Sequence, residues 1–104
     1  MDVPRPLTEA EISAELATVP GWLRDGETIH RTYPLRYHAG VAVIVHVADR
    51  ERRIGHHADI DLRMDHVRFS ITTHDADYRL TRADFDLAAR IDAIVAAHQA
   101  LPVD

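Results

Sequence analysis

Three histidines lie where one loop and one strand end could bring their side chains together. His56 and His57 are adjacent, and His74 follows the segment Val67–Thr72, in which apolar and polar residues alternate. The pKa of free imidazole is close to neutral pH, so grouped histidines can donate and accept protons under physiological conditions. The alternation places His74 on the polar face of its strand, where a pocket could form. The pattern therefore predicts a proton-transfer site.

His56 and His57 can meet one ligand only if the backbone turns at this point. Adjacent residues in an extended chain point to opposite sides, so a straight segment would separate the two rings. Gly55 stands directly before the pair and ends a predicted helix. The helix end and the glycine make a turn feasible, and we expect both side chains to approach one pocket.

The elements that would position these histidines follow the order α-β-β-α-β-β-α. Thr8 and Glu11 form a capping box at the start of the first helix, and Pro20-Gly21 ends it. Thr81 caps the last helix, and Asp84 occupies its third position, where a carboxylate complements free backbone N–H groups. The other predicted elements are strands around Trp22–Arg24, Ile29–Tyr33, Ile60–Met64 and Val67–Thr72, and a helix over Tyr37–Arg53.

Short turns join the strands in pairs, which predicts two hairpins. Asp25-Gly26 and Asp65-His66 are the turn segments. Two hairpins between three helices predict an α+β fold, with a four-stranded antiparallel sheet and the helices packed on one face. The length fits a single domain over residues 1–104. The second face of the sheet would stay open and polar, with Asp61, Arg63, Arg68, Ser70 and Thr72 on it.

The second helix carries more apolar surface than one small core can use. Its main apolar stripe is widened by two further valines, so we expect this helix to contact more than one neighbour. Surplus apolar helix surface indicates self-association, as a homodimer or a homotetramer. The predicted stripe consists of Tyr37, Val41, Ile44, Val45 and Ala48, and Val43 and Val47 widen it.

Composition excludes several classes of function. Of the 104 residues, 46% are hydrophobic and 28% charged, and the formal net charge of −5 argues against a nucleic-acid-binding surface. No run approaches the roughly 18–20 apolar residues that cross a membrane, and the N-terminus lacks the layout of a secretory signal. The chain has no cysteine and hence no disulfide framework, so we expect a cytoplasmic location.

The element order, His56-His57 and the strand that ends in Thr73-His74 together resemble the pterin-4a-carbinolamine dehydratase family. Further segments that carry the resemblance are Asp59–Met64 and Leu80–Asp84, and the likeness covers nearly the whole chain. The resemblance implies dehydration of a 4a-hydroxytetrahydropterin to the quinonoid dihydropterin, a step in tetrahydrobiopterin recycling. It implies a pterin substrate and neither a metal nor an organic cofactor.

The resemblance also assigns roles to residues. His56, His57 and His74 would line the pterin site and catalyse the reaction, with His57 and His74 nearest the proton transfers and His56 in a positioning role. Asp84 matches an acidic position near the family's active site, although a partner for the helix dipole explains it equally well. Substrate contacts are expected from Asp84, Thr73 and Asp59.

The chain departs from the family pattern around the histidines. Ala58 replaces a usual proline, which loosens the loop because proline would fix φ. Asp77-Tyr78-Arg79 replaces a glycine-containing turn, Met64 a common aromatic residue and Arg52 a common acidic residue. These changes raise the alternative that the protein is catalytically altered and acts as a dimerisation partner or assembly chaperone for another protein.

A zinc site is a second chemical alternative. His56, His57, His66 and His74 supply enough nitrogen ligands for zinc. Their spacing matches no standard metal motif, and cysteine is absent. His66 would lie about 26 Å from His74 along an extended strand, so these two residues cannot share one ion. The sequence therefore favours a site without metal.

Overall fold

The computed structural model describes residues 4–99 and has the predicted α+β order. The ends of the predicted domain, residues 1–3 and 100–104, lie outside this range. Within residues 4–99, none of the helices combines the length and apolar character that crossing a membrane requires. The elements are α1 (Glu9–Leu16), β1 (Leu23–Asp25), β2 (Thr28–Tyr33), α2 (Tyr37–Ile54), β3 (Asp59–Leu62), β4 (Val67–Ile71), the short 3₁₀ helix η1 (His74–Ala76) and α3 (Arg82–Gln99).

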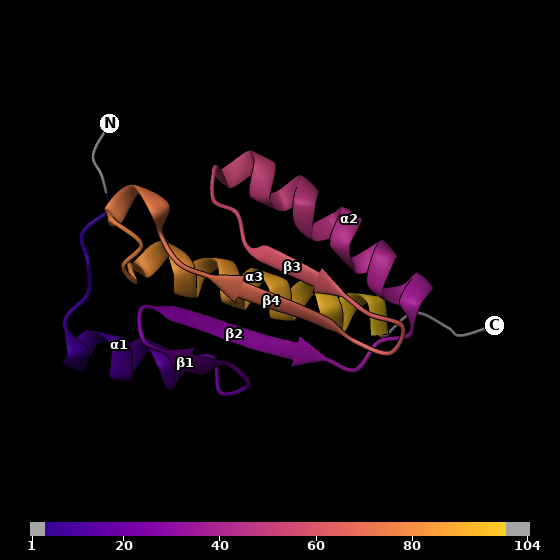
Figure 1. The fold of residues 1–104 in the computed structure, drawn as a ribbon, viewed down its shortest axis with the longest axis horizontal. Helices are drawn as coiled ribbons and strands as arrows, with labels where there is room; N and C mark the ends of the chain where they lie inside the picture. Colours follow the sequence, from indigo (N-terminus) through magenta and orange to yellow (C-terminus); the bar gives the residue numbers. More distant parts are fainter. Residues whose placement is uncertain (1–3, 100–104) are drawn as a thin grey trace.

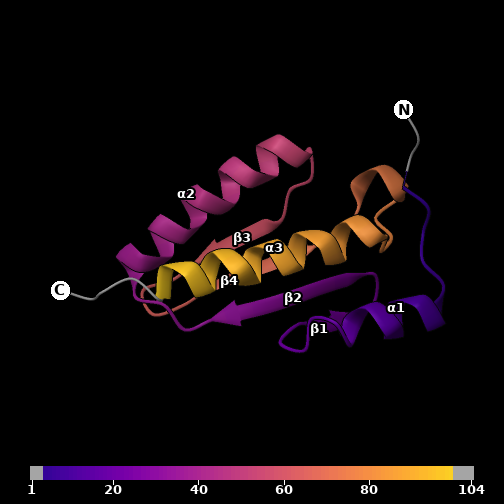
Figure 2. The ribbon, with the colours of Figure 1, turned by 180° about the vertical axis from the view of Figure 1, so that it is seen from behind.

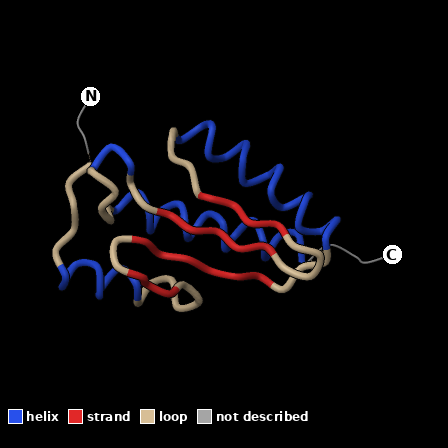
Figure 3. Tube along the Cα trace, viewed as in Figure 1, coloured by secondary structure: helices blue, strands red, loops and turns tan. Residues whose placement is uncertain are grey.

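The four strands form one antiparallel sheet in the order β1-β2-β4-β3 (Figure 3). Each predicted hairpin pairs internally, and β2 joins the two hairpins by pairing with β4. In that central pair Ile29 lies opposite Ile71 and Tyr33 opposite Val67. Because residues directly opposite share a face, this register puts the apolar residues of both strands on one side of the sheet.

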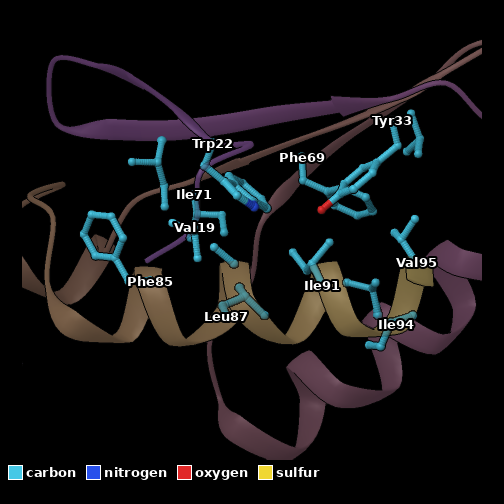
Figure 4. Packing of buried hydrophobic residues seen from close by; sticks show 14 of the residues in the cluster. Val19, Trp22, Tyr33, Phe69, Ile71, Phe85, Leu87, Ile91, Ile94 and Val95 are labelled. Carbon is cyan, nitrogen blue, oxygen red and sulfur yellow. The ribbon is translucent and has the colours of Figure 1, made fainter. Parts of the chain in front are cut away.

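The helices cover that apolar side. α3 runs along the sheet, behind it in Figure 1 and in front of it in Figure 2, while α2 packs against α3 and β3. In Figure 4 the buried side chains meet between the sheet and α3. The predicted arrangement of helices on one face is confirmed. The core includes Trp22, Ile29, Tyr33, Val43, Val47, Phe69, Ile71, Leu80, Leu87 and Ile91.

The buried face of α2 differs from the predicted main stripe. The helix buries Gly40, Val43 and Val47, and leaves Tyr37 and Val45 exposed by 42% and 65%. Close packing explains this rotation, because a Cβ at Gly40 would lie 2.9 Å from the Leu62 side chain. Glycine thus lets α2 approach β3. Within the predicted stripe, Ile44 packs against the core, whereas Val45 and Ala48 are exposed.

Several element ends also differ from the prediction. α1 ends at Leu16, before Pro20-Gly21, and a turn then carries Val19 and Trp22 into the core. β3 stops at Leu62, and Met64 is 79% exposed in the hairpin turn. The capping box of α1 is present as predicted, with hydrogen bonds in both directions between its two residues.

A polar cluster ties the first hairpin to the last helix. Asp92 on α3 accepts hydrogen bonds on its Oδ1 atom from Trp22 Nε1 at 2.9 Å and Arg31 Nη1 at 3.0 Å. Tyr33 donates to the same oxygen through its hydroxyl. Burial, followed by this contact with Asp92, raises the pKa of Tyr33 well above its usual range, so the phenol stays a donor. One carboxylate therefore anchors three side chains of the N-terminal third.

Replacing Asp92 by alanine should lower the free energy of unfolding by about 2–3 kcal/mol, because three donors lose their common acceptor. Urea denaturation followed by circular dichroism measures the change. Asp86→Ala is the matched control, since Asp86 lies exposed on the same helix and makes no side-chain hydrogen bond within residues 4–99. Equal stability of both variants would contradict the anchoring role.

Candidate active site

The loop after α2 turns sharply at Gly55. This residue has a left-handed backbone with φ of 70°, a conformation that glycine adopts without strain. The carbonyl oxygen of Glu51 accepts hydrogen bonds from the Gly55 N–H at 2.9 Å and the His56 N–H at 3.3 Å. The turn brings His56 and His57 to the wall of one pocket, so the turn that the sequence required is present.

His74 reaches the same pocket by a different route from the one predicted. β4 ends at Ile71, and His74 starts the 3₁₀ helix η1 instead of continuing the strand alternation. The Thr73 N–H bonds the Arg79 carbonyl, and the Thr73 carbonyl accepts from Ala76 N–H. This tight turn, rather than the polar face of the sheet, sets the direction of His74.

The pocket has a volume of about 130 Å³ and opens to solvent. In Figures 1 and 2 the loop after α2 and the orange segment before α3 lie at the same end of the sheet. The Tyr78 ring packs on the His74 ring, with 4.8 Å between centroids, but Tyr78 does not line the pocket. The three histidines therefore share an accessible cavity, whose lining is Gly55, His56, His57, Thr73, His74 and Asp75.

Asp84 lies behind His56 rather than inside the pocket. Its side chain is fully buried, and its Oδ1 atom is 2.7 Å from His56 Nε2. Its Oδ2 atom accepts hydrogen bonds from Thr73 Oγ1 and from the Thr81 backbone N–H, both at 2.8 Å. Asp84 is therefore not part of the pocket wall, but it contacts the pocket-lining residues His56 and Thr73. Its predicted place at the start of α3 is confirmed.

The Asp84 contact fixes the orientation of the His56 ring. A carboxylate can only accept, so Nε2 of His56 carries the hydrogen of this bond. In a neutral imidazole the other nitrogen, Nδ1, then has a free lone pair. His56 is 14% exposed, whereas His57 and His74 are exposed. The site therefore combines one held imidazole with two exposed ones.

Thr73 and Asp59, the other two residues expected to contact substrate, lie in different parts of the structure. Thr73 is buried but lines the histidine pocket, and it binds Asp84 and Thr81 through its hydroxyl. Asp59 lies on the open sheet face, where it lines a separate depression with Arg68. The structure therefore brings Thr73 to the histidines but not Asp59.

Sequence reasoning missed a second buried carboxylate at the site. Glu51 is 3% exposed, and its Oε2 atom accepts a hydrogen bond from the Ala58 N–H at 2.8 Å. Burial raises the pKa of Glu51, and the Ala58 bond and the nearby His57 and His56 act in the opposite direction. Its position four residues after Val47, on the buried face of α2, is the signal that could have found it.

The turn at Asp77 and Tyr78 has an unusual backbone. Asp77 and Tyr78 have φ angles of 55° and 59°, in the left-handed region that is unfavourable for residues with a side chain. The Tyr78 N–H donates to the Thr73 carbonyl at 3.1 Å, which holds the turn closed. The altered loop therefore keeps a compact form beside His74.

Metal ligation finds little support in the geometry. Among the residues that the structure describes, no three histidine, aspartate or glutamate side chains are grouped so that they could hold one ion.

Comparison with known proteins identifies the family. A family model described as Pterin 4 alpha carbinolamine dehydratase matches residues 5–94. A provisionally named pterin-4-alpha-carbinolamine dehydratase from Chloroflexus aurantiacus is 47% identical over 90 residues, which cover 86% of this chain and 96% of the relative. A relative with the same provisional name from Streptomyces avermitilis is 38% identical over 96 residues, or 91% of this chain and 95% of the relative.

A solved structure confirms the fold. The crystal structure of a transcriptional coactivator/pterin dehydratase from Brucella Melitensis superposes with a TM-score of 0.82, and covers 88% of this chain and 99% of that chain. Its sequence identity of 22% supports the fold alone. The match over residues 5–94 and a relative at 47% identity establish the family. The chain belongs to the pterin-4a-carbinolamine dehydratase family.

Proposed function

We propose that the protein dehydrates a 4a-hydroxytetrahydropterin to the quinonoid dihydropterin, the reaction that recycles tetrahydrobiopterin. The observation that carries this proposal is the single pocket lined by His56, His57 and His74, with the Asp84 carboxylate fixed behind it. Family membership supplies the substrate class, and the pocket supplies groups suited to proton transfer near neutral pH.

The reaction needs two proton transfers and no redox step. An acid protonates the oxygen on carbon 4a, which leaves as water, and a base removes a proton from a ring N–H. The total number of protons on the enzyme is unchanged, but the acid ends deprotonated and the base ends protonated. A proton must therefore pass from the base back to the acid, directly or through solvent, before the next turnover. His57 and His74 are the exposed imidazoles of the pocket, and we assign these transfers to them. Neutral and protonated imidazole are both accessible near pH 7, which suits either role.

His56 takes the positioning role in this proposal. Asp84 holds its Nε2–H, so the ring cannot rotate freely, and Nδ1 is left to accept a hydrogen bond from the substrate. Thr73 and Thr81 in turn hold Asp84. A pocket with one held ring loses less freedom when a flat substrate binds than a pocket with three mobile rings.

Removing a transferring imidazole should abolish most of the rate. We expect His57→Ala and His74→Ala each to lower kcat for 4a-hydroxytetrahydropterin dehydration by roughly 10²–10⁴-fold, the usual effect of losing a general acid or base. Stopped-flow absorbance of the product measures the rate, with and without a metal chelator. His66→Ala is the control, because His66 lies in the β3–β4 turn, outside the pocket. Wild-type rates in both site variants would refute the assignment.

Changing Asp84 to asparagine tests the positioning of His56. The amide can present a donor to His56 Nε2 and so favour the other tautomer, which we expect to lower kcat by roughly 10²-fold or more. Nitrogen-15 NMR of the His56 ring should report the change of tautomer. If the tautomer changes and kcat does not, His56 has no part in the reaction.

Self-association is a further part of the proposal, because part of the predicted apolar stripe of α2 is exposed to solvent. Tyr37 and Val45 are exposed on it, and Val41 and Ala48 continue it at helical spacing. We propose that a second copy covers this stripe in a homodimer or homotetramer. The alternative is a different protein in the same place, as the coactivator name of the Brucella Melitensis structure suggests. Such a partner would co-purify, and His57→Ala would not release it.

Val45→Glu should dissociate the oligomer, because it places a carboxylate in the middle of the stripe. Light scattering coupled to gel filtration measures the mass. Ala39→Glu provides the control, since Ala39 is also exposed on α2 but lies about a third of a turn or more from the residues of the stripe. A monomeric wild type at micromolar concentration would contradict self-association.

A further inference from the structure

Glu51 is a buried acid that the proposed reaction does not use. The residue is 3% exposed, and no arginine, histidine or lysine side chain within residues 4–99 forms an ion pair with it. Its side chain makes one hydrogen bond, at 2.8 Å to the Ala58 N–H. Burial of a carboxylate without a cation opposes folding. Glu51 therefore lowers the stability of the fold, and packing alone does not explain why a glutamate stands at this position.

Residue 51 holds the histidine loop from both sides. Its carbonyl oxygen accepts from the N–H groups of Gly55 and His56, which precede His57. Its carboxylate accepts from the N–H of Ala58, which follows His57. Two backbone N–H groups before His57 and one after it therefore donate to the same helical residue, and the backbone between them has little freedom to move.

The bond to Ala58 exists only because residue 58 has an amide hydrogen. Proline would fix the backbone φ at this position but would have no N–H to donate. Alanine leaves φ free and supplies the donor, and Glu51 accepts it. The Glu51 carboxylate thus restrains the loop by a hydrogen bond, whereas a proline ring at position 58 would restrain it covalently.

We propose that Glu51 is a positioning residue for His57, which it holds through the Ala58 amide. This inference rests on the proposed function for its catalytic meaning, but the restraint itself is independent of the reaction. Glu51 does not line the pocket, so its effect reaches the substrate only through the loop. Displacement of a catalytic group by about 1 Å can lower a rate by about 10²-fold, which makes such a restraint significant.

A double-mutant cycle tests the restraint. Glu51→Met removes the acceptor and the buried charge, and we expect kcat to fall by roughly 10- to 10²-fold while Tm stays the same or rises. Glu51→Gln keeps an acceptor oxygen and should retain nearly the wild-type kcat. Ala58→Pro should lower Tm in the wild-type background, because it leaves the Glu51 carboxylate without a donor, but should restore kcat in the Glu51→Met background.

Hydrogen exchange of the His57 and Ala58 amides and NMR of the His57 ring provide a second readout. Exchange should speed up in Glu51→Met, and the His57 ring signals should shift. Unchanged exchange and unchanged kcat in that variant, or an equal loss of Tm from Ala58→Pro in both backgrounds, would overturn the inference. If the wild type has no dehydratase activity, the proposed function fails, while exchange, ring signals and Tm still decide whether Glu51 holds the loop.

Discussion

A carboxylate without solvent contact persists in a small domain only when its oxygen atoms accept several strong hydrogen bonds. Asp84 meets this condition with donors from three segments of the chain: His56 after α2, Thr73 after β4 and Thr81 at the start of α3. The same bonds that offset its burial also bring these segments together. The pocket is therefore a consequence of how the chain satisfies one buried carboxylate, because the contacts that offset its burial also position the candidate site.

The architecture was predictable because local and long-range signals agree. Capping residues mark the starts of α1 and α3, and alternation from Val67 onward marks the central strand. The orientation of α2 was not predictable in this way. Valines at positions 41, 43, 45 and 47 are equally apolar, so periodicity alone allows more than one buried face. Gly40 against Leu62 decides between them, and that contact depends on the packed structure.

The candidate site shows the same division. Predicting that three histidines meet required only the end of one helix and the end of one strand. The structure brings His56, His57 and His74 to one pocket. The catalytic roles stay predictions. The sequence did not reveal that Asp84 contacts His56 or that Glu51 contacts Ala58. These buried carboxylates meet the histidine loop only in the packed structure. From the sequence, Ala58 in place of proline was expected to loosen the loop. In the structure, the Ala58 N–H, which proline would lack, donates a hydrogen bond to Glu51.

The attachment of the first hairpin to α3 has a consequence for biosynthesis. Trp22 and Asp92 are separated by 70 residues along the chain, and the Leu7 N–H bonds the Leu80 carbonyl. A nascent polypeptide on the ribosome can form α1 and the β1–β2 ribbon early, but their apolar side stays uncovered until α3 has left the exit tunnel. Contacts so distant in sequence slow folding and prolong the interval in which aggregation competes. Until α3 emerges, the apolar side of this hairpin is exposed to intermolecular contact.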